Sequence, residues 1–280
     1  MEKPVWTKIL TVVTLIAFAA NSVIGRQGLL SGGIGAGTFA CARVLFGALA
    51  LSALVGPRRC LEKGDWKSAI ALVAYAYCFS FAYLEVEAGP GALILFAVVQ
   101  ITMLGCALLR GEWLRPIQWC GLALAMGALT WWLWPKSGSP ALGGCLTMGL
   151  AGIGWGTYSL LGVGKSNPVL RTAGNFLRAA PLALGTLVIV QVLRPEPIPD
   201  RVGLAWAALT GAVTSGMGYV LWYTALKGLS VSQAGIAQLT VPVIAAGSGI
   251  LFLGEPATIT FGLTALFVLL GVGLATLQRR

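Results

Sequence analysis

The sequence has no histidine and only nine acidic residues among 280. Histidine is the commonest general base and the commonest metal ligand, so its absence argues against a metalloprotease or a Ser-His hydrolase. The cysteines form no CxxC pair and no other spacing typical of a metal site; they are Cys41, Cys60, Cys78, Cys106, Cys120 and Cys145. We therefore expect a protein that is not an enzyme and that has no metal and no cofactor.

Charged residues are scarce as well. They make up 10% of the chain, against about 25% in ordinary soluble domains. Hydrophobic residues make up 57%, and the mean hydropathy is +0.85. So little polar surface cannot cover a water-soluble particle of this size, which makes lipid the expected surroundings. The net charge of +10 lies in short loops and not in a stripe interleaved with aromatic residues, so we expect no nucleic-acid partner.

Long apolar runs dominate the chain instead. A transmembrane helix needs about 20 mostly apolar residues, and ten such runs are separated by Gly, Pro or charged residues. They are 7–26, 35–56, 68–87, 90–109, 116–134, 143–163, 173–193, 203–226, 231–252 and 257–277. The sequence thus predicts an all-α integral membrane protein with ten transmembrane helices.

The basic residues predict the orientation of these helices, because cytoplasmic loops are enriched in Lys and Arg. With a cytoplasmic N-terminus, 13 of the 19 basic residues fall on the inner side, and four fall outside: Arg26, Lys136, Arg194 and Arg201. Both termini, including Arg280, are then cytoplasmic, and the protein is expected in a bacterial-type inner membrane. The segment from Lys3 to Ala19 resembles a signal peptide, but we expect a retained first helix because the following repeat requires it.

An internal repeat relates the two halves of the chain. Residues 88–112 and 231–255 align without gaps at an offset of 143, with five of 25 pairs identical. Further matches pair Arg43 with Arg178 and Phe18 with Trp155 in corresponding spans.

Each half of the chain, 1–135 and 136–280, is predicted to hold five spans. Because five is an odd number, the second half must lie inverted in the bilayer, with both termini on one side. Inverted halves that exchange conformations open a central site first to one side and then to the other.

Motifs in both halves indicate a family. They are Gly-Leu-Ser-Val-Ser-Gln-Ala at 228–234, Leu-Thr-Val-Pro-Val at 239–243, Leu-Gly-Glu-Pro at 253–256, Ala-Arg-Val-Leu-Phe-Gly at 42–47 and, more weakly, Arg-Ala-Ala-Pro at 178–181. They resemble the EamA repeat of the drug/metabolite transporter superfamily. The resemblance implies a ten-helix fold that moves small metabolites, often outward, including amino acids and related compounds. The first half has no proline that matches Pro242, and the resemblance leaves the substrate open.

Polar side chains within a span normally face a cavity or a neighbouring helix, because they are costly in lipid. Gln100 lies near the middle of the fourth span and Thr240 near the middle of the ninth, at the depth where such transporters bind solute. Pro242 also frees a backbone carbonyl near Gln238. We predict a central substrate site with the candidates Asn21, Tyr75, Tyr77, Phe79, Gln100, Tyr158, Tyr219, Trp222, Gln238 and Thr240. Alternatively, these amides hold helices together.

Aromatic and small residues also recur at helical spacing. Tyr75, Phe79 and Tyr83 share one face of the third span, which suits either stacking on a planar or cationic solute or ordinary packing. Gly211 and Ser215 fit a small-xxx-small pattern, which is typical of close helix contacts.

Arg43 and Arg178 are charges within spans, expected in the outer and inner thirds of the membrane. They could attract a substrate carboxylate or gate each side in turn. Alternatively they bind helix-end carbonyls or reach to headgroups. We favour this structural role, because an arginine here resembles a feature of the whole family.

The acidic residues near spans lie at span ends: Glu85, Glu87, Glu112 and Glu255. None is expected in mid-membrane, where proton-coupled pumps often place a carboxylate, and this favours a facilitator or an exchanger.

The sequence therefore predicts a secondary transporter, a monomer or homodimer, that exports small organic metabolites, with amino-acid-like solutes favoured. One alternative is a multidrug or cationic-compound efflux protein, which the aromatic faces suit but the two arginines do not. An intramembrane enzyme would need a cluster of His, Asp or Glu. A channel or scaffold has no need of the inverted duplication.

Overall fold

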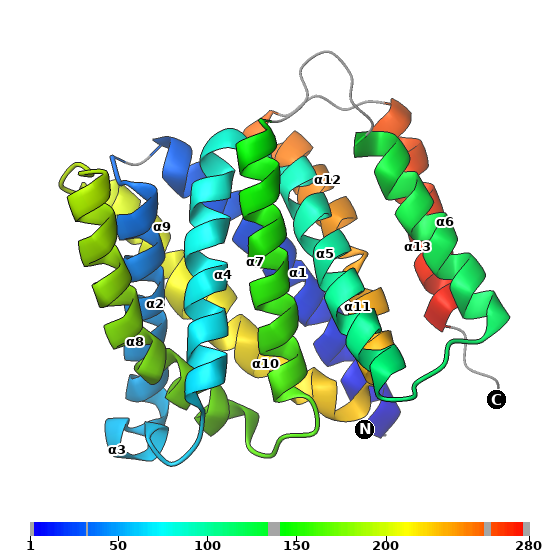
Figure 1. The fold of residues 1–280 in the computed structure, drawn as a ribbon, viewed down its shortest axis with the longest axis horizontal. Helices are drawn as coiled ribbons and strands as arrows, with labels where there is room; N and C mark the ends of the chain where they lie inside the picture. Colours follow the sequence, from blue (N-terminus) through cyan, green and yellow to red (C-terminus); the bar gives the residue numbers. More distant parts are fainter. Residues whose placement is uncertain (1–2, 32, 134–140, 255–258, 277–280) are drawn as a thin grey trace.

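The computed structural model describes residues 3–31, 33–133, 141–254 and 259–276, and throughout these ranges the regular elements are helices (Figure 1). Glu255, Lys136, Arg279 and Arg280 lie outside the described residues. The first half contains α1 (Lys3–Ser31), α2 (Ala36–Val55), the short α3 (Pro57–Cys60), α4 (Trp66–Glu85), α5 (Ala88–Leu109) and α6 (Pro116–Leu133).

The second half has more interruptions. It contains α7 (Leu142–Gly162), α8 (Pro168–Leu193), α9 (Arg201–Leu209), the π-helix η1 (Thr210–Met217), α10 (Gly218–Ala225), the 3-10 turn η2 (Leu226–Gly228), α11 (Val231–Gln238), α12 (Val241–Leu253) and α13 (Ile259–Thr276).

Seven helical segments among the described residues are long and apolar enough to cross a membrane. They are Val5–Ser31, Ala36–Val55, Trp66–Glu85, Ala88–Leu109, Pro168–Leu193, Arg201–Gly228 and Val231–Leu253. The prediction of an all-helical protein with many membrane-spanning segments is therefore confirmed. The count of ten spans and the cytoplasmic termini stay predictions, because α6, α7 and α13 do not meet the same measure of length and apolarity.

Corresponding helices of the two halves run in opposite directions. In Figure 1, α1 begins at the end of the bundle where α3 lies, whereas α7 begins at the opposite end, where α9 starts. We call these the α3 end and the α9 end. The packing is reciprocal: α1 contacts α10 and α12, and α7 contacts α4 and α5. Corresponding helices also pair across the halves, namely α2 with α8, α5 with α12 and α6 with α13.

Side-chain caps begin several of these helices. Asp65 accepts the backbone N–H of Ser68 (2.8 Å) at the start of α4, and Asp200 accepts that of Gly203 (2.7 Å) at the start of α9. An acceptor at this position satisfies one of the free N–H groups of the first turn. The two caps therefore fix corresponding helices at opposite ends of the bundle.

Two interruptions shape the second half. The helix of residues 231–253 is broken at Leu239 and Thr240, and Pro242 stands at the start of α12. Proline lacks an N–H and clashes with the preceding turn, so it ends one helix and begins the next. The π-helix η1 lies against α2, where a Cβ on Gly211 would come within 2.2 Å of the Arg43 carbonyl. Glycine is thus required for this close approach of two backbones.

Candidate functional site

The guanidinium of Arg43, on α2, lies enclosed among the helices, with 1% of the residue exposed. Its Nε donates to Ser215 Oγ (2.9 Å), and its Nη2 donates to Tyr75 Oη (3.0 Å) and Tyr219 Oη (2.8 Å). These partners come from η1, α4 and α10. One side chain therefore connects helices from both halves of the chain.

Arg43 has no counter-charge in the described part of the chain, where no carboxylate lies within ion-pair distance of it. Its Cζ instead lies over the rings of Tyr75 and Phe79, 5.0 and 4.7 Å from their centroids. Its Nη1 is buried and has no hydrogen-bond partner among the described residues. A buried polar group without a partner is costly, so Nη1 is a donor that the described residues leave unsatisfied.

Asn21 joins α1 to this group. Its Nδ2 donates to Tyr75 Oη (3.1 Å), and its Oδ1 accepts from Thr214 Oγ1 (2.8 Å) and Ser215 Oγ (3.4 Å). We call Asn21, Arg43, Tyr75, Ser215 and Tyr219 the central polar cluster. Each of these residues is at most 3% exposed, so a solute reaches the cluster only when helices move apart.

Aromatic rings form the wall of the central polar cluster. Trp155 lies against Tyr219 (4.5 Å between centroids) and Tyr75 (5.3 Å). Phe18 meets Trp155 edge to face at 5.0 Å. The internal repeat pairs Phe18 with Trp155, and the fold brings these two rings into contact.

Two buried amides, Gln238 on α11 and Gln100 on α5, differ in how fully they are hydrogen-bonded. Trp155 Nε1 donates to Gln238 Oε1 (2.7 Å), and Gln238 Nε2 contacts Met103 Sδ and the Ala234 carbonyl, both at 3.2 Å. Gln100 is 1% exposed, yet neither atom of its amide has a partner in the described part of the chain. Its Oε1 faces Gly235, where a Cβ would lie 2.8 Å away. Gln238 is thus a satisfied helix contact, whereas Gln100 is a buried amide with unused bonds.

The other candidates lie outside the central polar cluster. Tyr77 donates to the Ala183 carbonyl (2.6 Å) on α8, because two residues place it about 200° around the helix from Tyr75. Thr240 is half-buried and donates to the Ala237 carbonyl (2.9 Å). Trp222 donates to Ser159 Oγ (3.0 Å) and packs on Phe18, and Tyr158 stacks on Trp155 at 5.5 Å.

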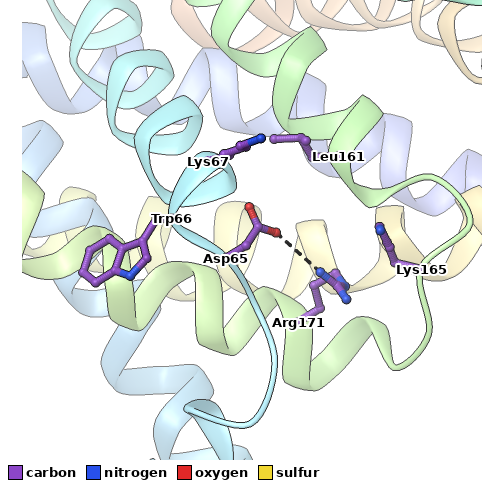
Figure 2. Close-up of a pocket in the computed structure, with 6 residues that line it drawn as sticks. All are labelled: Asp65, Trp66, Lys67, Leu161, Lys165 and Arg171. Carbon is purple, nitrogen blue, oxygen red and sulfur yellow. Dashed lines mark hydrogen bonds and ion pairs between the residues drawn. The ribbon is translucent and has the colours of Figure 1, made fainter.

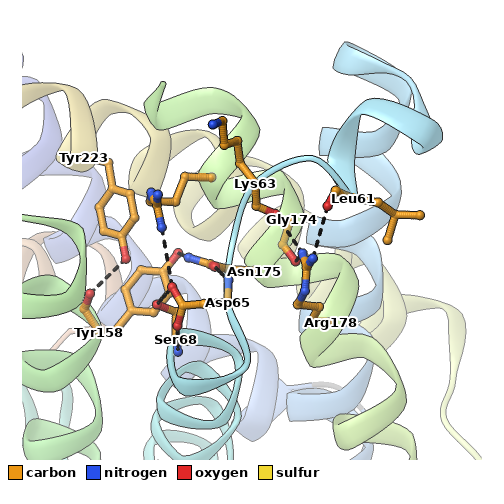
Figure 3. Close-up of polar contacts among 10 residues, drawn as sticks. Leu61, Lys63, Asp65, Ser68, Tyr158, Gly174, Asn175, Arg178 and Tyr223 are labelled. Atoms are coloured by element: carbon orange, nitrogen blue, oxygen red, sulfur yellow. Dashed lines mark hydrogen bonds and ion pairs between the residues drawn. The ribbon is translucent and has the colours of Figure 1, made fainter. Parts of the chain in front are cut away.

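A set of polar contacts leads from Tyr158 to the α3 end (Figure 3). Asn175 Nδ2 donates to Tyr158 Oη (3.4 Å), and Asn175 Oδ1 accepts the backbone N–H of Asp65 (3.0 Å). Tyr223 donates to the Tyr158 carbonyl (2.8 Å). These contacts hold α8 and α10 against α7 and against the segment before α4.

Arg178 has a different role from that of Arg43. Its Nη1 donates to the carbonyls of Lys63 (2.7 Å) and Gly174 (3.1 Å), and its Nη2 donates to that of Leu61 (3.1 Å), as Figure 3 shows. A Cβ on Gly174 would lie 1.9 Å from the Lys63 carbonyl. We call Asn175 and Arg178, with the segment 61–65 that they bind, the α3-end clamp.

A hollow of about 510 Å³ opens beside this clamp (Figure 2). Its lining residues are Asp65, Trp66, Lys67, Leu161, Lys165 and Arg171. Asp65 and Arg171 point toward each other across it, with Oδ2 and Nη1 3.5 Å apart. With three cationic side chains and one carboxylate, the hollow has a positive lining.

At the α9 end, the carboxylate of Glu196 joins the segment after α8 to the start of α2. Glu196 accepts the backbone N–H groups of Gly37 and Thr38 and the Thr38 hydroxyl, all at 2.8 Å. It therefore binds the first turn of α2, where the N–H groups and the helix dipole favour a negative charge. We call Glu196, Gly37 and Thr38 the α9-end clamp.

Asp200 stands next to the α9-end clamp. Its backbone N–H donates to the Gly33 carbonyl (3.1 Å), which joins the start of α9 to the segment before α2. Hydrogen bonds from the backbone N–H groups of Gly203 and then Gly33 lower the pKa of the Asp200 carboxyl from its ordinary value.

Five residues that make these contacts are not among the candidates predicted from the sequence: Asp65, Arg171, Glu196, Thr214 and Ser215. In the sequence, Ser215 fits only a small-residue packing pattern with Gly211. Its position four residues before Tyr219 was the usable signal, because residues four apart share a helix face. The two clamps depend on contacts between distant segments, for which the sequence has no local signal.

The chain is similar to known proteins in both sequence and fold. Residues 142–277 match the EamA-like transporter family. An uncharacterized protein of Pseudomonas aeruginosa is 44% identical over 276 residues, which are 98% of this chain and 95% of that protein. A solved structure, described only as the crystal structure of a protein, superposes with a TM-score of 0.73 over 96% of each chain at 15% identity. At this identity the superposition shows the fold alone.

Proposed function

The chain belongs to the EamA-like transporter family of the drug/metabolite transporter superfamily, and from this premise we propose that it exports small organic metabolites, with amino-acid-like solutes favoured, by alternating access. In this proposal the halves 1–135 and 136–280 lie inverted in a bacterial-type inner membrane, as a monomer or homodimer. The α3 end faces the cytoplasm and the α9 end faces outward.

One observation supports this mechanism most strongly: the central polar cluster lies between two clamps that join the same pair of helices. The α3-end clamp binds α8 to the segment that follows α2, and the α9-end clamp binds α2 to the segment that follows α8. Release of one clamp while the other holds opens the cluster to one side only, which is the requirement of alternating access.

The unused hydrogen bonds support a polar solute. Gln100 has a buried amide without partners among the described residues, and Arg43 has a free Nη1. Aromatic rings line the central polar cluster at Trp155, and the Arg43 guanidinium lies over the Phe79 ring. The polar groups of a solute can form the unused hydrogen bonds, and its apolar or planar body can pack on the rings.

Efflux of cationic drugs is the second candidate, and the aromatic wall favours it. A cation next to Arg43 is repelled, however, and no described carboxylate is within ion-pair distance of that guanidinium to offset its charge. We therefore favour the metabolite.

The test is uptake into proteoliposomes across a panel of amino acids, nucleosides and organic cations, with and without a pH gradient. We expect saturable transport of at least one amino-acid-like solute and little effect of the pH gradient. Transport of organic cations alone would replace the first candidate with the second, and an absence of saturable transport for every solute would contradict both.

Gln100→Ala is the variant that tests the site. We expect it to slow transport about tenfold, because the solute loses hydrogen bonds in a buried place, while expression and thermal stability are retained. Thr102→Val is the matched control: it removes a hydroxyl whose one hydrogen bond within the described residues goes to the Val98 carbonyl of its own helix (2.8 Å). Equal transport by both variants would reduce Gln100 to a helix contact.

A further inference from the structure

The hydrogen-bond donors of Arg43 are incompletely used. A guanidinium has five N–H bonds in one plane. Three of them point to Ser215, Tyr75 and Tyr219. The two on Nη1 have no acceptor among the described residues. The free edge of this buried cation is therefore a double donor.

The acceptors that Arg43 does have are neutral hydroxyls. A buried cation is stable when it is paired with an anion and fully hydrogen-bonded, and neither condition is met within the described residues. Stacking on Tyr75 and Phe79 offsets part of the cost through cation–π attraction. The rings stack on the plane of the guanidinium and do not accept hydrogen bonds at its edge, so Nη1 still lacks a negatively charged acceptor.

The scaffold holds this guanidinium in place without that acceptor. Gly211 lets η1 lie directly against the Arg43 backbone, and Ser215 of the same π-helix fixes Nε. Asn21 fixes the hydroxyl of Tyr75 that Nη2 uses. Short π-helices occur frequently at functional sites. A cation that is rigidly oriented, with one edge unpaired, is preorganised for a ligand.

We propose that Nη1 of Arg43 binds the carboxylate of the transported solute. This inference rests on the proposed function, and it narrows the solute to organic acids, amino acids among them, while it excludes amines and amides that lack the acid. The carboxylate accepts the two free N–H bonds and supplies the missing counter-charge, and the body of the solute lies against the aromatic wall that includes Trp155.

Arg178 is the matched arginine without such a site. Both of its terminal nitrogens donate to carbonyls of the α3-end clamp or of α8 itself. It therefore offers a control in which an arginine is lost from the corresponding helix while the carboxylate site remains.

The test is equilibrium binding to the purified full chain in detergent, measured by thermal shift and by tryptophan fluorescence. The probes are acid–amide pairs of equal shape: phenylalanine and phenylalaninamide, leucine and leucinamide, succinate and succinamide. For at least one pair we expect the acid to bind wild type about tenfold or more tightly than the amide, as fits a charge-assisted bond. We expect Arg43→Gln to abolish that preference, Arg43→Lys to reduce it, and Arg178→Gln to keep it.

The outcomes separate this inference from the proposed function. Equal binding of acid and amide to wild type needs no variant and would overturn the carboxylate site, even if transport is observed. Binding of no acid at millimolar concentration, or an acid preference that survives in a folded Arg43→Gln protein, would overturn it too. Arg43-dependent acid binding without uptake or exchange in proteoliposomes would support the site and contradict the transporter.

Discussion

Arg43 and Arg178 lie on α2 and α8, helices that pair with each other across the two halves, yet their surroundings differ. Arg43 is buried against hydroxyls and rings and keeps a free edge, whereas Arg178 is bound to backbone carbonyls at the α3 end. A repeated residue type therefore does not imply a repeated role. One arginine lies in the candidate site and the other in a clamp.

Substitution of the glycines beside the two arginines should destabilise the protein most. In Gly211→Ala the new methyl group clashes with the Arg43 carbonyl and pushes η1 away from α2. In Gly174→Ala the methyl group clashes with the Lys63 carbonyl and pushes α8 away from that segment. We expect each to lower the free energy of unfolding in detergent by about 3 kcal/mol, because backbone cannot move aside for a methyl group. Only Gly211→Ala should also weaken acid binding. Gly105→Ala, whose methyl group meets open space, is the control. Equal acid binding by Gly211→Ala and Gly174→Ala would contradict the assignment of different roles to the two arginines.

Arg178→Gln should have the next largest effect. It removes charge-assisted bonds to the carbonyls of Leu61 and Lys63, and we expect the free energy of unfolding to fall by about 2 kcal/mol. Hydrogen exchange should accelerate in residues 61–65 and stay unchanged at the α9 end. Unchanged exchange in 61–65 would show that Arg178 does not hold the clamp.

Glu196→Gln should have a smaller effect. The amide replaces a charged acceptor at the start of α2 with a neutral one, and we expect a loss of about 1 kcal/mol in the free energy of unfolding. The amides of Gly37 and Thr38 should exchange faster. Faster exchange at residues 61–65 instead would contradict the assignment of this clamp to the α9 end.

The pH dependence of Asp200 should be the smallest effect. Its pKa is lowered in the folded protein, so its hydrogen bonds add stability above its unfolded pKa, and that stability is lost as the pH falls through the folded pKa. We expect the thermal midpoint of wild type to fall more steeply than that of Asp200→Asn between about pH 5 and pH 3. Parallel curves would show that ionisation of the Asp200 carboxyl contributes nothing to stability.

The fold was largely predictable because its signal is local. Apolar runs and the turns between them define where helices lie, and Pro242 marks the break before α12. The π-helix was not predictable: Thr210–Met217 reads as an ordinary apolar segment, and its widened turn reflects packing against α2.

The candidate site was predictable in part. Asn21, Arg43, Tyr75 and Tyr219 stand out because polar groups in a span need partners. Which partners they find depends on the pairing of helices far apart in sequence. The contact of Arg43 with Ser215 was therefore not predicted, and for Arg178 the binding of carbonyls was predicted but not its partners in residues 61–65. Tyr77 was predicted as a site residue but lies outside the central polar cluster, because its two-residue spacing from Tyr75 turns its side chain toward α8.

Alternating access requires the α3-end clamp and the α9-end clamp to open in turn. Paired spin labels at Ser31 and Arg194 report separation at the α9 end, and labels at Glu62 and Ser166 report it at the α3 end, in separate doubly labelled proteins in lipid. With and without a transported acid, we predict that the population with a long distance grows at one end as it shrinks at the other. Distances that lengthen at both ends together, or at neither, would contradict alternating access.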